Sequence, residues 1–136
     1  MTTKNPETYT EGLGEIIRAH RLFIGLSQRD MAARVGKDRR DYQRIESGKD
    51  ACPPGLLGQV ETLSDAFAYQ VETVLDLAEK HAQEHDGEAL ELAVITDGTP
   101  GQEWERLVAG RAAVETSESA PVRLVVVEQT TSQKPA

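Results

Sequence analysis

The chain has 136 residues, of which 38% are hydrophobic and 4% aromatic, and its formal net charge at pH 7 is -8. This length fits one small domain, or a small domain with an accessory unit. No apolar run approaches the roughly 18 residues of a membrane span and no signal-peptide pattern is present, so we expect a cytoplasmic protein without a membrane partner. The single Cys52 cannot form an intramolecular disulfide, which fits a reducing compartment.

The charge is distributed unevenly along the chain. Residues 1–50 hold ten Lys and Arg against eight Asp and Glu, whereas residues 51–136 hold five against fifteen. A positive segment within an acidic chain is typical of proteins that bind a polyanion. A mixed, solvated surface would give the same numbers, so the charge alone does not decide between these interpretations.

A first helix is predicted after a polar N-terminus. Residues 1–9 are polar with one proline, and we expect them to be disordered. From Leu13 apolar residues recur at spacings of three and four, with Ile16 and either Phe23 or Ile24 on the apolar face. Gly25 then ends the helix, because a glycine tolerates the positive φ that this position requires.

Two shorter helices follow. Ser27 can cap a helix over residues 27–35 by accepting a backbone N–H, and Asp38 can cap a further helix in the same way. Gly36 and Gly48 end these two helices. The resulting pattern is a helix, a tight turn that contains glycine, and a second helix.

The third helix carries an unexpected set of charges. Tyr42 and Ile45 are three residues apart and face inward. The remaining face and the first turn hold Arg39, Arg40, Gln43 and Arg44. Arginines near a helix N-terminus oppose the helix dipole, and a local conflict of this kind is typical of functional sites. The alternative is a solvated charged face that nearby acidic residues offset.

The three helices together resemble a known family. From Leu13 to Lys49 the sequence reads LGEIIRAHRLFIGLSQRDMAARVGKDRRDYQRIESGK. It resembles the helix-turn-helix of the Cro and phage-repressor (XRE-type) group of DNA-binding proteins. The residues that match the family pattern are Gly14, Arg21, GLSQ at 25–28, Ala32, Gly36, Ile45, Glu46 and Gly48.

The resemblance implies roles for individual residues. Arg21 and Glu46 would form an internal ion pair. The side chains that read bases would be Arg39, Arg40, Gln43 and Arg44, and the contacts to the DNA backbone would come from Ser27, Gln28, Ser47 and Lys49. Three arginines at reading positions predict G-containing half-sites. Lys37, in place of an apolar residue, and Tyr42, in place of a smaller aliphatic one, depart from the family and predict a slightly different helix angle.

A long helical segment comes next. Residues 56–85 contain one glycine and no proline, and their apolar positions recur at helical spacing. An unbroken helix of this length would extend for roughly 45 Å, more than a small domain covers. Either the helix bends near residues 67–69 or its second half packs on another surface. The apolar stripe indicates a core or a subunit interface.

In the C-terminal third the sequence pattern changes from that of a helix to that of strands. Residues 89–96 and 121–128 are rich in β-branched side chains and predict two strands. Between them a turn at 97–99 and a helix over 100–115 are expected, with Thr99 as its cap and Pro100 in its first turn. A two-stranded sheet is marginal in water, so we expect a second copy to complete it. The residues expected at this dimer interface are Val71, Val74, Trp104, Leu107, Leu124 and Val126.

The predicted architecture is mainly α with a small α+β tail. It consists of a disordered N-terminus (1–9), a helix-turn-helix DNA-binding domain (10–66), the end of the long helix with a β-α-β dimerisation unit (67–128), and a flexible tail (129–136). This layout resembles that of the anti-CRISPR-associated repressors and of related uncharacterised bacterial regulators.

We therefore expect a homodimeric, sequence-specific transcriptional regulator that binds a palindromic double-stranded operator. The expected action is repression, and one form of it is autoregulation in a phage or mobile element. The alternative is an antitoxin or antirepressor-type adaptor whose acidic C-terminal unit binds a protein partner. HAQEH at 81–85 fits an inverted zinc-peptidase pattern, but a third ligand and a cleft are not evident. We expect no enzyme activity, no metal and no cofactor.

Overall fold

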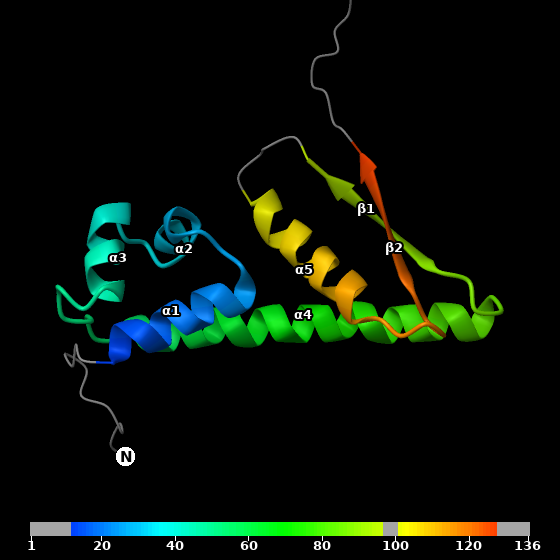
Figure 1. Cartoon of the computed structure of the whole chain (residues 1–136), viewed down its shortest axis with the longest axis horizontal. Helices are drawn as coiled ribbons and strands as arrows, with labels where there is room; N and C mark the ends of the chain where they lie inside the picture. Colours follow the sequence, from blue (N-terminus) through cyan, green and yellow to red (C-terminus); the bar gives the residue numbers. More distant parts are fainter. Residues whose placement is uncertain (1–11, 97–100, 128–136) are drawn as a thin grey trace, which may run out of the picture. The chain divides into compact units, whose positions relative to one another are not determined.

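The computed structural model describes residues 12–96 and 101–127, which are mainly helical with a small two-stranded sheet (Figure 1). The chain divides into two compact units, Met1–Ala66 and Phe67–Ala136. No helix within the described ranges has the length and apolar character that a membrane crossing requires. The expectations for residues 1–9, for the turn at 97–99, for Thr99 and Pro100 at the start of the following helix, for Glu128 and for residues 129–136 lie outside the described residues.

Three helices of the first unit follow the local sequence signals. They are α1 (Leu13–Ile24), α2 (Gln28–Arg34) and α3 (Arg39–Glu46). Both predicted caps are confirmed: the Ser27 hydroxyl accepts a hydrogen bond from the Asp30 N–H at 3.0 Å, and Asp38 Oδ1 accepts one from the Arg40 N–H at 3.1 Å. Gly25 has a φ of 101°, as its place at the end of α1 requires.

The core of the first unit is formed by one face of each helix. Its fully or nearly fully buried side chains include Leu13, Ile17, Ile24, Met31, Tyr42 and Ile45. One expectation for α1 was wrong, because Ile16 is 42% exposed. Of the two alternatives at the end of the helix, Ile24 is buried and Phe23 is 42% exposed. Ile16 and Phe23 lie seven residues apart and therefore share a helix face, but that face is not the one that packs on α2 and α3.

Helix α4 (Leu56–Glu84) is a single continuous helix of 29 residues. It begins in the first unit and ends in the second. Leu56 and Val60 are buried in the part that belongs to the first unit, and Phe67, Val71 and Ala78 are buried in the remainder. Each half of α4 thus contributes apolar residues to a core.

The second unit continues with β1 (Leu90–Ile95), α5 (Gln102–Glu115) and β2 (Val122–Val127). The two strands pair in parallel from Leu90 opposite Val122 to Ile95 opposite Val127. Helix α5 connects them and contacts both. A crossover helix is the usual way to join parallel strands, because a tight hairpin can only join antiparallel ones.

Two of the six predicted interface residues are core residues instead. Trp104 is buried, and its indole N–H donates to Gln70 Oε1 at 2.9 Å. Its ring packs edge-on against that of Phe67, with the ring centroids 5.7 Å apart. Val71 is buried as well. A side chain that its own chain already covers offers little surface to a partner. Leu124 and Val126 are 36% and 67% exposed, and Val74 and Leu107 are half-buried.

Candidate nucleic-acid interface

The inner side of α3 is held by a buried carboxylate. Glu46 accepts hydrogen bonds from Arg21 Nε at 2.8 Å and Arg21 Nη2 at 2.9 Å, so these residues form a two-point ion pair. Gln28 Nε2 donates to the same carboxylate at 2.8 Å, and the Tyr42 hydroxyl donates at 2.6 Å. The acceptor positions of the carboxylate are therefore well occupied, as the burial of a charge requires.

These contacts change the ionisation of the groups that make them. Burial alone would raise the pKa of Glu46, but the hydrogen bonds from Arg21, Tyr42 and Gln28 outweigh it and lower that pKa. Burial, together with the hydrogen bond to Glu46, raises the pKa of the Tyr42 hydroxyl. The bond to Glu46 also raises the pKa of Arg21. At neutral pH the network thus contains an ionised Glu46, a charged Arg21 and a neutral Tyr42.

Close backbone packing holds the same region. Gly14 lies on α1 where that helix meets the end of α3. A Cβ atom at this position would lie 2.4 Å from the Glu46 carbonyl oxygen and 2.6 Å from that of Ile45. These distances are too short for any side chain, so a glycine is required. The network and this contact together hold α3 against α1.

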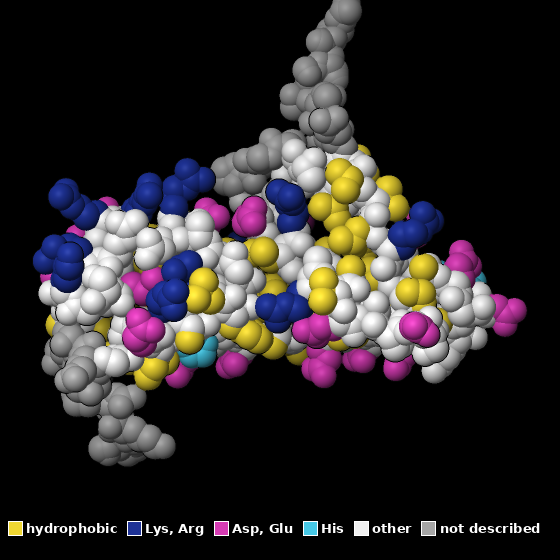
Figure 2. Space-filling model, in the orientation of Figure 1, with side chains coloured by type: hydrophobic (Ala, Val, Ile, Leu, Met, Phe, Trp, Pro, Cys, Tyr) yellow, Lys and Arg dark blue, Asp and Glu magenta, His cyan; other side chains and the backbone are white. Residues whose placement is uncertain are grey.

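The predicted base-reading residues on the outer side of α3 differ in their exposure and in their contacts. Arg39 and Arg40, in the first turn, are exposed. Gln43 is half-buried and donates from Nε2 to Gln28 Oε1 at 3.0 Å. Arg44 is exposed and pairs with Asp50, which raises the Arg44 pKa. In Figure 2, Lys and Arg side chains gather over the region of α2 and α3.

The residues expected to touch a DNA backbone also divide into groups. Ser27 and Lys49 are exposed, and the Ser27 oxygen accepts the cap hydrogen bond, which leaves its O–H available to donate. Ser47 is exposed but donates to the Arg44 carbonyl oxygen at 3.2 Å. Gln28 is half-buried and links Gln43 to Glu46. Its amide therefore serves the inner network, which the sequence pattern did not predict.

The sequence pattern does not predict two contacts of this region. The first is the ion pair of Asp50 with Arg44. The second is the hydrogen bond that the Tyr42 hydroxyl donates to Glu46, since the pattern predicts only that Tyr42 adds bulk. The contact of Tyr42 could have been inferred, because a buried tyrosine hydroxyl needs a partner and Glu46 lies one helical turn further on. The contact of Asp50 depends on the path of a loop.

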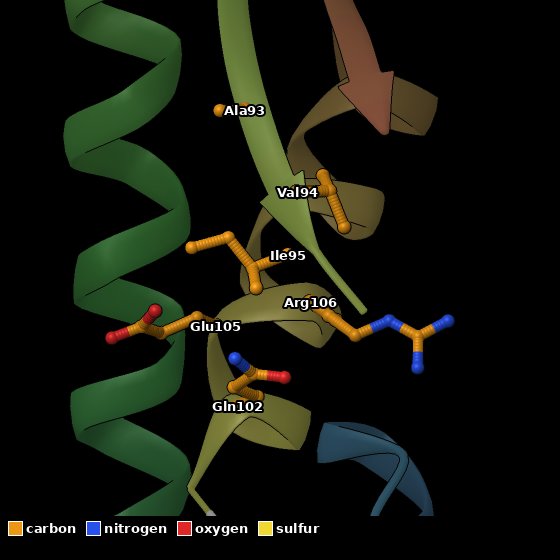
Figure 3. Close-up of a pocket in the computed structure, with 6 residues that line it drawn as sticks. All are labelled: Ala93, Val94, Ile95, Gln102, Glu105 and Arg106. Carbon is orange, nitrogen blue, oxygen red and sulfur yellow. The ribbon is translucent and has the colours of Figure 1, made fainter. Parts of the chain in front are cut away.

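The second unit has two open surface hollows of about 350 Å³ and 360 Å³ that border α4, and a smaller, more enclosed cavity. The smaller cavity, of about 40 Å³, lies between the end of β1 and the start of α5, lined by Ala93, Val94, Ile95, Gln102, Glu105 and Arg106. Ligand sites usually have a volume of about 300–1,000 Å³. Figure 3 shows that the charged ends of Glu105 and Arg106 point away from each other.

The histidine pair at the end of α4 does not form a metal centre with other described residues. The rings of His81 and His85 lie 4.3 Å apart. Among the residues that the structure describes, no group of three or more His, Cys, Asp or Glu side chains could hold a metal ion. A hydrolytic zinc site requires three protein ligands and an open position.

Comparisons of the chain with protein-family models and with curated proteins find no match. The assignment of a function therefore depends on the geometry of the first unit and on the chemistry of its exposed side chains.

Proposed function

We propose that this protein is a homodimeric, sequence-specific DNA-binding transcriptional regulator, with α2 and α3 as a helix-turn-helix and α3 as its recognition helix. The observation that supports this most is the contrast between the two sides of α3. Its inner side is anchored by a buried ion pair and by a glycine contact, and its outer side exposes three arginines. Such a helix can enter the major groove without rearranging its own support.

The chemistry of the exposed residues suits duplex DNA. Arginine can donate two parallel hydrogen bonds to guanine O6 and N7, and each such pair discriminates by about 1–3 kcal/mol against a wrong base. Arg39, Arg40 and Arg44 would supply these contacts. Gln43 keeps its Oε1 as an acceptor, which suits an amino group of adenine or cytosine. Ser27 and Lys49 would contact phosphates and set the register.

The first experiment is the selection of bound sites from a library of random duplexes. We expect an inverted repeat with G-containing half-sites whose centres are about 34 Å apart, or one helical turn of DNA, because a two-fold dimer reads both halves alike. Binding should weaken steeply as the salt concentration rises, because phosphate contacts release counterions. A selected site without any G·C pair would contradict the assignment of the arginines.

The second experiment tests Arg40. We expect Arg40→Ala to lower the affinity for the selected site by about 1–3 kcal/mol, and to lower the affinity for random duplex by less. Arg106→Ala is the matched control, because Arg106 is an exposed arginine of the second unit and the charge change is the same. Equal losses on both duplexes would make Arg40 a phosphate contact.

The homodimer is the part of the proposal that concerns the second unit. Strand β2 contains four consecutive apolar residues, Leu124 to Val127, that are 36–67% exposed. Hydrophobic side chains gather over the strands in Figure 2. An exposed apolar edge strand favours pairing with another strand, and a second copy supplies an identical one. The same edge would also suit a protein partner, which keeps the adaptor function as a second candidate.

A further inference from the structure

Arg44 is held by a carboxylate that lies beyond the end of its own helix. Its Nε donates to Asp50 Oδ2 at 2.9 Å, and its Nη2 donates to Asp50 Oδ1 at 3.1 Å. The two side chains are 47% and 42% exposed, so this ion pair lies at the surface. Exposed ion pairs contribute little to stability, and stability therefore does not explain a two-point contact at this position.

The backbone brings Asp50 to Arg44. The N–H groups of Lys49 and Asp50 both donate to the Arg44 carbonyl oxygen, at 2.9 Å and 3.1 Å. The chain reverses at Gly48, whose φ of 84° is favourable only for glycine. Asp50 is therefore tied to Arg44 at two places, through its own N–H and through its carboxylate. The loop holds the carboxylate beside the guanidinium group.

The contact leaves one edge of the guanidinium group available. Arginine has five N–H donors in a planar fork, and Asp50 occupies the Nε donor and one Nη2 donor. The remaining three donors lie on Nη1 and on the outer side of Nη2. Guanine recognition requires two parallel donors from such an edge. A planar group fixed on one side by a carboxylate can present the other side in only a narrow range of directions.

We infer that Asp50 is a positioning residue that orients Arg44 toward a guanine, so that the Arg44–Asp50 pair, rather than Arg44 alone, determines which base is read at one position of each half-site. This inference rests on the proposed function. Asp50 also places a negative charge near the DNA phosphates, which lowers affinity for every duplex. Asp50 thus lowers the affinity for all duplexes and increases the discrimination at one base pair.

The test compares Asp50→Asn with Asp41→Asn. Asp41 is an exposed aspartate on α3, one turn before Arg44, so both variants remove one negative charge close to the same arginine. Binding is measured on the selected operator and on operators with a single substitution at the base pair whose discrimination Arg44→Ala removes. Circular dichroism and melting temperature show whether each variant is folded.

We expect both variants to bind random duplex more tightly. Only Asp50→Asn should lose discrimination at the Arg44 base pair, by about tenfold, since asparagine cannot hold the guanidinium fork through two charge-assisted bonds. Unchanged discrimination in a folded Asp50→Asn variant would overturn the inference while the proposed function stands. A wild-type protein that prefers no duplex sequence would overturn the proposed function itself.

Discussion

Gly14 determines how closely α1 can approach α3. It stands in the first turn of α1, and glycine is in general a poorer helix former than alanine. The structure explains its presence, because a Cβ atom would lie 2.4 Å from the backbone oxygen of Glu46. A backbone atom cannot move aside as a flexible side chain can. The glycine is therefore a condition for the approach of α1 to α3.

We expect Gly14→Ala to lower the free energy of unfolding by about 1–3 kcal/mol, the usual cost of overpacking. Gly58→Ala is the matched control, because Gly58 is an exposed helical residue of the same unit and a Cβ atom there would meet nothing within 4 Å. That substitution should be neutral or slightly stabilising. Urea denaturation measures both, and equal stabilities would contradict the close contact.

At the scale of elements, α3 depends on a carboxylate network that joins three helices. Arg21 belongs to α1, Gln28 to α2, and Tyr42 and Glu46 to α3. A buried ion pair adds little to stability compared with an apolar contact, but the removal of one partner is costly because the other is left unpaired. The network therefore specifies the position of α3 more than it stabilises the unit.

The lowered pKa of Glu46 predicts a pH dependence. A carboxyl group with a lower pKa in the folded state contributes stability above its unfolded pKa of roughly 4.3. This contribution is lost as the pH falls through the folded value. We expect Glu46→Gln to cost about 3–5 kcal/mol at neutral pH and to remove that part of the acid sensitivity.

Glu15→Gln serves as the control for the network, because the Glu15 side chain is 74% exposed on α1. This variant should unfold with a pH profile close to that of the wild type. Free energies of unfolding, measured from neutral pH down to about pH 3, distinguish the pH profile of Glu46→Gln from that of Glu15→Gln. If both variants had the same profile, Glu46 would not be a source of the acid sensitivity.

At the scale of the whole molecule, the proposed regulator requires two copies. One helix in one major groove reads only half of a palindrome, and the specific affinity of repressors of this kind depends on both halves. The second unit supplies the proposed contact through β2, an edge strand whose exposed residues are largely apolar. DNA binding and self-association are therefore expected to fail together.

We expect Val126→Lys to convert a dimer into a monomer and to weaken operator binding, since a lysine on an edge strand opposes edge-to-edge pairing. Val126 is 67% exposed, and Val114, at 82%, provides the control Val114→Lys with the same chemistry outside β2. Sedimentation equilibrium gives the mass of each variant. A Val126→Lys protein that remains dimeric would exclude β2 as the interface, and a monomeric wild type would exclude the dimer.

Local signals in the sequence determined the helices of the first unit, their caps and their glycine ends. Caps and end glycines act over two to six positions, so they can be read from neighbouring residues, as Ser27, Asp38 and Gly25 show. The three exposed arginines of α3 were predicted on the same basis. The ion pair of Arg21 with Glu46 came from the family resemblance and is present in the structure.

Only the tertiary structure decided which apolar faces are covered and which polar groups meet. It exposed Ile16, buried Trp104 in the core, and brought Gln28 to Gln43 and Asp50 to Arg44. Periodicity gives the face of a helix but not the neighbour against which that face packs. These contacts depend on the packing of elements distant in the sequence or on the path of a loop, and a sequence pattern describes neither.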